Sequence, residues 1–135
     1  ENFSSLIKRR FVIGSFVLQK ENQEKYFINA KKARRLIVNI FNELFTKYDG
    51  LIMPAASNIA PLIKDTTDEM GKNEIVLDTH LLIGNFGGYP SITIPYNKLN
   101  NMPVGINITS GYKKDGEMLS IANNIESIIK EDSNV

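Results

Sequence analysis

The chain contains no cysteine, which excludes disulfides, thiolate metal sites and a cysteine nucleophile. It has a single histidine, His80, so a histidine-rich zinc site is also excluded. No apolar run reaches the length of a membrane-spanning helix, and no signal-peptide pattern opens the sequence. We therefore expect a soluble protein of a reducing compartment, which in practice means a cytoplasmic one.

Motifs that bind phosphate, dinucleotides or metals are also missing. The serines do not lie in a nucleophile-elbow pattern, and His80 has no partner motif that would make it a catalytic base. Asp68 and Glu69 are expected to be solvated rather than to hold a metal ion. The sequence thus predicts no catalytic residue and no metal ligand in this chain, which is not a complete enzyme by itself.

Size and composition indicate one domain or part of one. The chain has 135 residues, 42% of them hydrophobic, and a net charge of +1, which argues against binding polyanions with its whole surface. It starts at Glu1 and enters a predicted helix almost at once. Helices alternate with only three short strands, an α/β pattern with few strands for a free-standing sheet. We expect residues 1–135 to be a single fragment of a longer protein.

Two helices are predicted in the first half of the chain. Asn2, Ser4 or Ser5 can cap a helix that runs to about residue 19. Its residues 11–18 are apolar on nearly every side, so we expect burial on more than one face. An amphipathic helix is expected over residues 24–47. Its polar side carries Lys25, Lys31, Lys32 and Arg35, which indicate a solvated surface or, alternatively, a contact strip for RNA phosphate.

The second half is organised around residues 75–110. An apolar helix precedes Gly87 and Gly88, which let the backbone pass where a side chain would clash, and Pro90 blocks the helix from continuing. Strands are predicted over residues 51–54, 91–95 and 104–109, the last two separated by an asparagine-rich loop. A final helix is expected from an Asp115 N-cap, with Glu126 paired to Lys130. The expected apolar side of this helix comprises Leu119, Ala122, Ile125, Ile128 and Ile129.

Two charges stand in apolar surroundings. Asp78 lies among leucine, isoleucine and valine residues, and Arg10 falls on the apolar line of the first helix. Burial of either charge is costly without a partner. One interpretation is a buried ion pair that joins two helices. The alternative is a pocket for a zwitterion, in which the guanidinium binds an α-carboxylate and the carboxylate accepts hydrogen bonds from an α-ammonium.

Five segments resemble the amidase signature family. They are KRRFVIGSFVLQ (8–19), YFINAKKARRLI (26–37), YDGLIMPAASNIAP (48–61), NFGGYPSITIP (85–95) and MPVGINI (102–108). The resemblance covers nearly the whole chain, in the right order and spacing, and corresponds to the C-terminal part of the family's fold. The first segment resembles most the tRNA-dependent branch, whereas the Gly-x-Pro turn is shared by the wider family. Within the turn, Gly87 and Tyr89 depart from the usual Ala-Gly-Leu-Pro.

The resemblance implies the fold, the chemistry and the partners. It implies an α/β fold in which a large mixed sheet is flanked by helices, completed by this segment. The family's Ser–cis-Ser–Lys triad lies upstream, so this chain alone is expected to be inactive. In the tRNA-dependent branch, residues matching Arg10 and Asp78 hold the donor glutamine. The implied reaction releases ammonia from glutamine through an acyl-enzyme.

The implied complex contains B and C subunits, one of which uses that ammonia with ATP and Mg²⁺ to amidate Glu-tRNA(Gln). No cofactor is expected in this chain, and no membrane contact. Two rival functions remain open from the sequence: an amidase that acts on a different small amide, and a non-catalytic module that binds RNA or protein.

Overall fold

The computed structural model describes residues 3–60 and 79–132. In chain order its elements are α1 (Ser5–Leu18), α2 (Lys20–Asn22), the π-helix η1 (Gln23–Ile28), α3 (Asn29–Leu44) and β1 (Leu51–Pro54). From residue 79 onward come the 3₁₀ turn η3 (Thr79–Leu81), α5 (Leu82–Gly87), β2 (Ser91–Leu99), β3 (Met102–Thr109) and α6 (Asp115–Asp132). Helices combined with a sheet confirm the predicted α/β class.

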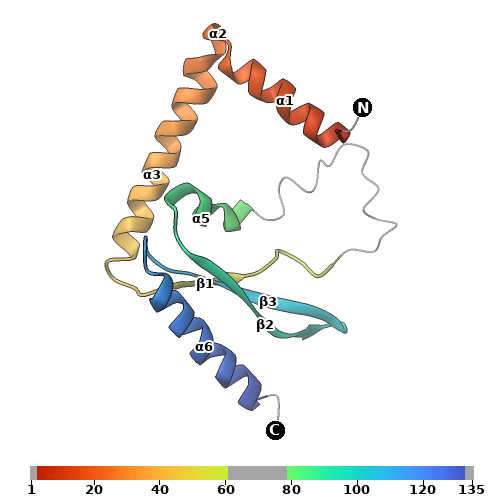
Figure 1. Ribbon diagram of the computed structural model, residues 1–135, viewed down its shortest axis with the longest axis vertical. Coiled ribbons are helices and arrows are strands. Elements are labelled where there is room, and N and C mark those ends of the chain that lie inside the picture. Colours follow the sequence, from red (N-terminus) through yellow and green to blue (C-terminus); the bar gives the residue numbers. More distant parts are fainter. Residues whose placement is uncertain (1–2, 61–78, 133–135) are drawn as a thin grey trace.

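The three strands form an antiparallel sheet in the order β1-β3-β2. Leu51 of β1 and Ser91 of β2 both lie opposite Thr109 of β3, which fixes the register on both sides of the central strand. A mixed sheet, which the family resemblance implies for the complete fold, therefore needs parallel strands from outside the described residues. In Figure 1, α6 lies on one side of the sheet and α5 on the other.

The hydrophobic core lies between the sheet and α6. Ile94 and Ile108, on adjacent strands, pack with Met118 and Ala122 of α6, and all four are buried. Burying an aliphatic side chain of this size is worth about 1.5–3 kcal/mol, so this contact holds α6 on the sheet. Further residues pack against the core and are partly buried: Ile92, Ile106, Ile121, Ile125 and Ile129.

The α6 helix differs from its prediction in two ways. Its first residue is Asp115, which was expected to be the N-cap, and the side that it buries is slightly different. The Met118 N–H donates to the Lys114 carbonyl at 3.0 Å, so Asp115 is already inside the helix and is not its N-cap. The predicted Glu126–Lys130 ion pair is confirmed at 3.0 Å. The expected burial of Leu119 and Ile128 is wrong, since they are 53% and 58% exposed, and Met118 and Ile121 face the sheet instead.

Strands β2 and β3 form a hairpin that is longer than predicted. The expected asparagine-rich loop is reduced to Asn100 and Asn101, which have positive φ angles of 51° and 62°. Two consecutive left-handed residues make the turn that best matches the twist of paired strands, and asparagine tolerates this conformation. The polar residues before and after the turn therefore continue the ladder, with an irregularity between Pro95 and Asn97.

The first helix follows its predicted bounds. The Ser4 hydroxyl accepts a hydrogen bond from the Ile7 N–H at 3.4 Å and caps α1, which ends at Leu18. Figure 1 shows α1 and α3 meeting at an angle near α2. Between them the backbone passes through the π-helix η1, a feature that the amphipathic pattern did not predict.

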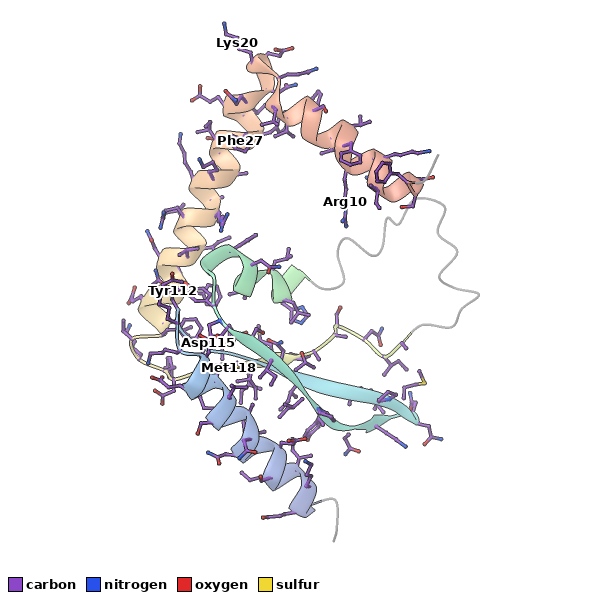
Figure 2. All side chains as sticks on the ribbon, viewed as in Figure 1. Arg10, Lys20, Phe27, Tyr112, Asp115 and Met118 are labelled. Atoms are coloured by element: carbon purple, nitrogen blue, oxygen red, sulfur yellow. The ribbon has the colours of Figure 1, made fainter. Side chains whose placement is uncertain are left out.

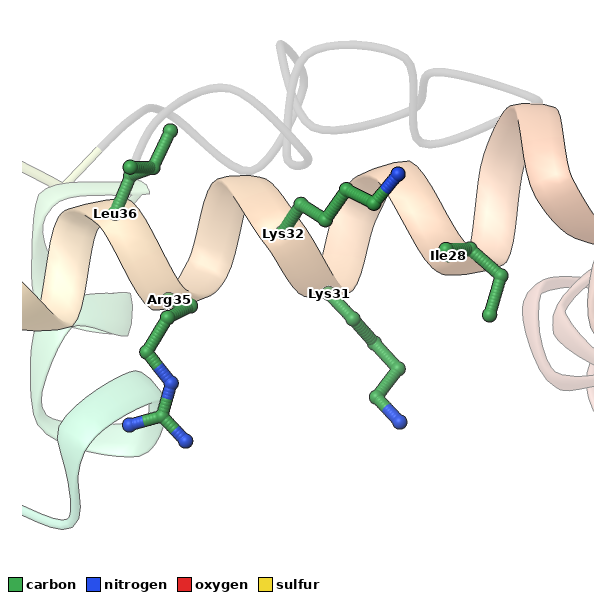
Figure 3. Close-up of a pocket in the computed structure, with 5 residues that line it drawn as sticks. All are labelled: Ile28, Lys31, Lys32, Arg35 and Leu36. Carbon is green, nitrogen blue, oxygen red and sulfur yellow. The ribbon is translucent and has the colours of Figure 1, made fainter.

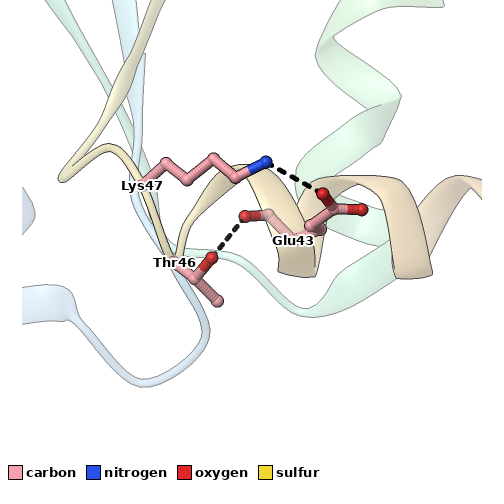
Figure 4. Close-up of polar contacts among 3 residues, drawn as sticks. All are labelled: Glu43, Thr46 and Lys47. Carbon is pink, nitrogen blue, oxygen red and sulfur yellow. Dashed lines mark hydrogen bonds and ion pairs between the residues drawn. The ribbon is translucent and has the colours of Figure 1, made fainter.

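The C-terminal end of α3 is closed by local contacts. The Thr46 hydroxyl donates to the Glu43 carbonyl oxygen at 2.7 Å, and Lys47 Nζ lies 2.9 Å from Glu43 Oε1 (Figure 4). The first contact is to a backbone carbonyl in the last turn of the helix, and the second is an i, i+4 ion pair between exposed side chains. The chain then turns through Asp49 and Gly50 into β1, which has its predicted bounds.

Candidate functional site

Arg10 lies on α1 and is exposed, as are Phe11, Val12 and Ile13 beside it. In Figure 2 its side chain extends from α1 toward the inner side of the angle between α1 and α3. It forms no ion pair with another described residue. The expectation that α1 is buried on more than one face is wrong, because most of its side chains are exposed and, among the described elements, it packs mainly on α2 and η1 at its C-terminal end.

Asp78 lies outside the described residues, so the proposed meeting of Arg10 and Asp78 stays a prediction. The next residue along the chain opens η3. There, His80 Nε2 lies 2.8 Å from the Pro54 carbonyl oxygen at the end of β1. His80 thus joins η3 to the sheet.

The end of α5 is held by Arg34 of α3. Its Nε donates to the Phe86 carbonyl at 2.9 Å, and its Nη2 donates to the Asn85 carbonyl at 3.4 Å. A cation suits this position, because carbonyl groups at a helix C-terminus carry partial negative charge. Sequence reasoning did not single out Arg34, whose contacts reach more than 50 residues along the chain.

The predicted clash of an added side chain is confirmed at Gly87, whereas Gly88 is required for its backbone conformation. Gly88 caps α5 in the left-handed conformation, with φ of 70°. A Cβ atom added at Gly87 would overlap the ring of Tyr89. These two positions let Tyr89 turn back beneath α5 toward α3, and Pro90 then leads into β2.

Tyr89 fills the space between α3, α5 and β2. Its ring is 5% exposed and meets Phe45 edge to face at 5.1 Å between centroids. Its hydroxyl donates to Asn42 Oδ1 at 2.7 Å and lies 3.1 Å from the Val38 carbonyl oxygen. Burial raises the pKa of the Tyr89 phenol above its ordinary value of 10.0, because the phenolate would lose its hydration.

The face of the sheet opposite the α6 core carries a polar network that the sequence interpretation missed. Asn107 Oδ1 accepts from the Ser91 hydroxyl at 3.0 Å, and Asn107 Nδ2 donates to Thr93 Oγ1 at 3.1 Å. Thr109 Oγ1 lies 3.1 Å from both Ser91 Oγ and Asn107 Oδ1. The detectable signal was the alternation Ser-x-Thr on one strand opposite Asn-x-Thr on the next. This network fixes the hairpin register, since a one-residue slip would turn its members toward the apolar core.

Ser110 is fully buried where β3 ends, and its hydroxyl has no hydrogen-bond partner among the described residues. Its Oγ would lie 3.5 Å from a Cβ atom added at Gly50. The described residues contain no group of three or more histidine, aspartate or glutamate side chains placed to hold a metal ion. Within the same ranges no helix is long and apolar enough to cross a membrane.

The lysine and arginine side chains on the predicted polar side of the amphipathic helix are exposed, as expected. Lys25 lies 5.2 Å from the ring centroid of Tyr26, and Lys31 lies 5.5 Å from that of Phe27. Lys31, Lys32 and Arg35 form no ion pair with any residue in the described ranges. The amphipathic prediction therefore places these cations correctly.

Comparisons with known proteins agree in sequence and in fold. The family model described as Amidase matches residues 1–119. The A subunit of the glutamyl-tRNA(Gln) amidotransferase of Sulfolobus acidocaldarius is 32% identical over 130 residues, which are 96% of this chain and 27% of that protein. The corresponding A subunit of Mycoplasma genitalium is 39% identical over 117 residues, 86% of this chain and 24% of that protein. The chain thus spans about a quarter of the length of these relatives.

Two solved structures share the fold. The crystal structure of the A subunit of the glutamyl-tRNA(Gln) amidotransferase from Thermotoga maritima matches with a TM-score of 0.67 and 30% identity, over 87% of this chain and 26% of that one. A crystal structure of an amidase matches with a TM-score of 0.71 and 22% identity, over 93% of this chain and 29% of that one. The second likeness concerns the fold alone.

Proposed function

Because the chain belongs to the amidase family, we propose that it is the C-terminal part of the A subunit of a glutamyl-tRNA(Gln) amidotransferase. The observation that supports this most is the similarity to such subunits over nearly the whole chain, at 27–39% identity among the relatives compared. The proposed activity is the release of ammonia from glutamine, which the complete complex uses to convert Glu-tRNA(Gln) to Gln-tRNA(Gln).

In this proposal the chemistry belongs to residues outside this chain. A serine attacks the side-chain amide carbonyl of glutamine, the C–N bond breaks, and the nitrogen leaves as ammonia after it takes a proton. Water then hydrolyses the acyl-enzyme to glutamate. The triad that performs these steps is expected upstream, so the 135 residues alone should be inactive. ATP and Mg²⁺ are assigned to a partner subunit, within a cytoplasmic complex that also contains B and C subunits.

The role assigned to this chain is to hold the donor. Arg10 would bind the α-carboxylate of glutamine and Asp78 its α-ammonium. Arg10 is exposed on the inner side of the α1–α3 angle and forms no ion pair with another described residue, and this supports a ligand role. Its guanidinium can bind a carboxylate through two parallel hydrogen bonds.

The apolar surface of α1 supports placement within a larger subunit. Phe11, Val12 and Leu18 are 59%, 69% and 56% exposed. Contiguous exposed apolar side chains of this kind mark surfaces that another element covers. We propose that the rest of the A subunit packs on α1, and that this packing surrounds Arg10 with the low-dielectric environment in which a charge-assisted contact is strong.

The test uses the complete A subunit with its partner subunits and three amides. Glutamine carries both α-groups, 4-carbamoylbutanoate lacks the ammonium, and 4-aminobutanamide lacks the carboxylate. The proposal predicts ammonia release from glutamine with kcat/KM at least about a hundredfold above either analogue, since each loses one charge-assisted contact. Equal use of all three, or a preference for an amide without α-charges, would show that the protein is an amidase for another substrate.

A further inference from the structure

Helix α3 has an exposed, positively charged face in the described structure. We define the α3 basic face as Ile28, Lys31, Lys32, Arg35 and Leu36, which line a groove of about 500 Å³. These positions follow the i, i+3, i+4, i+7, i+8 spacing, so they lie along one side of the helix. Figure 3 shows Lys31 and Arg35 extending together to one side of this face and Lys32 and Leu36 to the other.

This face borders the side by which α3 packs on the rest of the structure. Contacts to α5 and Tyr89 come from Arg34, Val38 and Asn42, which follow i, i+4, i+8 spacing next to Lys31 and Arg35. Lys31, Lys32 and Arg35 are all exposed. The α3 basic face is therefore exposed in the described structure, beside the contacts that α3 makes with α5 and Tyr89.

Its charges are not compensated locally. No aspartate or glutamate occurs between Lys25 and Asn42 in the sequence, and the three cations make no ion pair with a described residue. Like charges three and four residues apart on a helix repel one another, which is a cost in the free protein. An anionic partner would relieve that cost.

The apolar members decide which anionic partner fits. Leu36 is 65% exposed and Ile28 is half-buried at the other end of the groove. Phosphates of a nucleic acid would use the cations and leave both aliphatic side chains against water. The nearby Phe27 ring could stack on a base, but the Lys31 ammonium already lies over it, 5.5 Å from the ring centroid. A protein segment that offers carboxylates and apolar side chains together would use all five positions.

We propose that the α3 basic face docks an acidic amphipathic segment of a partner subunit, with its carboxylates on Lys31, Lys32 and Arg35 and an apolar side chain between Ile28 and Leu36. This inference rests on the proposed function for the existence of partner subunits. It adds the surface by which they are held and the chemistry of the segment that binds there.

The experiment measures the dissociation constant of each purified partner from the complete A subunit. The charge-reversal variant is K31E/K32E/R35E, and the matched control is K20E/K98E/K113E, which reverses three exposed lysines elsewhere. We expect the first to weaken binding of one partner by about a hundredfold or more and the control by less than about threefold, because like charges across an interface repel strongly. Unchanged binding by the first variant would overturn the proposal.

A second variant separates protein docking from RNA binding. Leu36→Ser leaves the charges intact. It should therefore weaken binding of the partner subunit by about tenfold and leave the salt dependence of that binding unchanged. An oligouridine RNA serves as the competing probe. RNA binding that is lost in K31E/K32E/R35E, unaffected by Leu36→Ser and accompanied by unchanged partner affinity would assign the face to nucleic acid and contradict the proposal.

Folding and catalysis are controlled separately. The milder K31Q/K32Q/R35Q variant should keep the melting temperature of the A subunit within about 2 °C of the unsubstituted protein. It should still weaken binding of the partner subunit by about tenfold. If this variant also fails to fold, the face is covered by the A subunit itself and the proposal is wrong. The binding measurement needs no turnover. If the complete protein failed to hydrolyse glutamine, the proposed activity would be refuted, but the measured affinity for the partner subunit would still test the docking proposal.

Discussion

At the scale of the residue, Tyr89 connects three elements through different kinds of contact. Its ring packs on Phe45 at the end of α3, its backbone follows the glycine turn after α5, and its hydroxyl meets Asn42. The sequence predicted the turn, because glycine and proline have fixed conformational meanings. It did not predict the contacts that join Tyr89 and Arg34 to distant elements, since such contacts depend on how the elements pack and not on neighbours in the chain.

Replacing Tyr89 with phenylalanine in the complete subunit should cost about 1 kcal/mol of stability, because the buried ring stays and only the hydroxyl contacts are lost. The difference should shrink as pH rises. Burial raises the folded-state pKa of Tyr89 above its unfolded value near 10, so the stabilisation is present below about pH 10 and is lost as pH rises through the folded pKa. Urea unfolding at pH 8 and above pH 10 measures both effects. A constant difference would contradict this description of Tyr89.

The glycine turn gives a second prediction at this scale. Gly87→Ala should lower stability by about 1–3 kcal/mol, because the new methyl group would overlap the Tyr89 ring. Gly88→Ala should cost about 1–2 kcal/mol for its positive φ. Gly116→Ala in α6 is the matched control, since no atom lies within 4 Å of its added Cβ, and it should be neutral or slightly stabilising. Melting temperatures of the three variants decide the matter; equal values would show that the turn is not constrained.

At the scale of the element, the helices and strands were predicted best where one local signal dominates. The capping residues at the start of the chain, of which Ser4 makes the cap, located α1, and short β-branched runs located β2 and β3. The extent of the hairpin was missed because Asn100 and Asn101 form a two-residue turn, whereas a polar run alone suggests a longer loop. The buried side of α6 was misjudged at Leu119 and Ile128 because apolar residues lie on more than one side of that helix, and only the position of the sheet decides between them.

For α3, replacing Lys31, Lys32 and Arg35 together with glutamine should change the melting temperature of the complete subunit by no more than about 2 °C. Solvated charges contribute little to stability, and these three make no ion pair with described residues. Thermal unfolding followed by circular dichroism is sufficient to test this. A collapse in stability would mean that the basic side of the helix is packed inside the subunit.

At the scale of the whole molecule, the main hydrophobic cluster of the described residues lies on one side of the sheet. Ile94, Ile108, Met118 and Ala122 bury α6 against the sheet, while α1 leaves its large apolar side chains exposed. Sequence reasoning predicted that α1 would be covered and that Arg10 would sit in apolar surroundings. Both expectations are wrong for the described residues, where Arg10 and most of α1 are exposed. The small number of strands and the family resemblance were the signals that predicted a larger protein.

The most direct test of the central claim compares two sources of nitrogen in the complete complex. Arg10→Ala and Asp78→Asn should each lower kcat/KM for glutamine-driven amidation of Glu-tRNA(Gln) by roughly thirtyfold or more, because each removes a charge-assisted contact to a desolvated ligand. Amidation driven by added ammonia should survive in both variants, since ammonia bypasses the glutamine site, and the melting temperatures should stay unchanged. If instead both activities fall together and the melting temperature drops, Arg10 and Asp78 form a structural ion pair and do not bind glutamine.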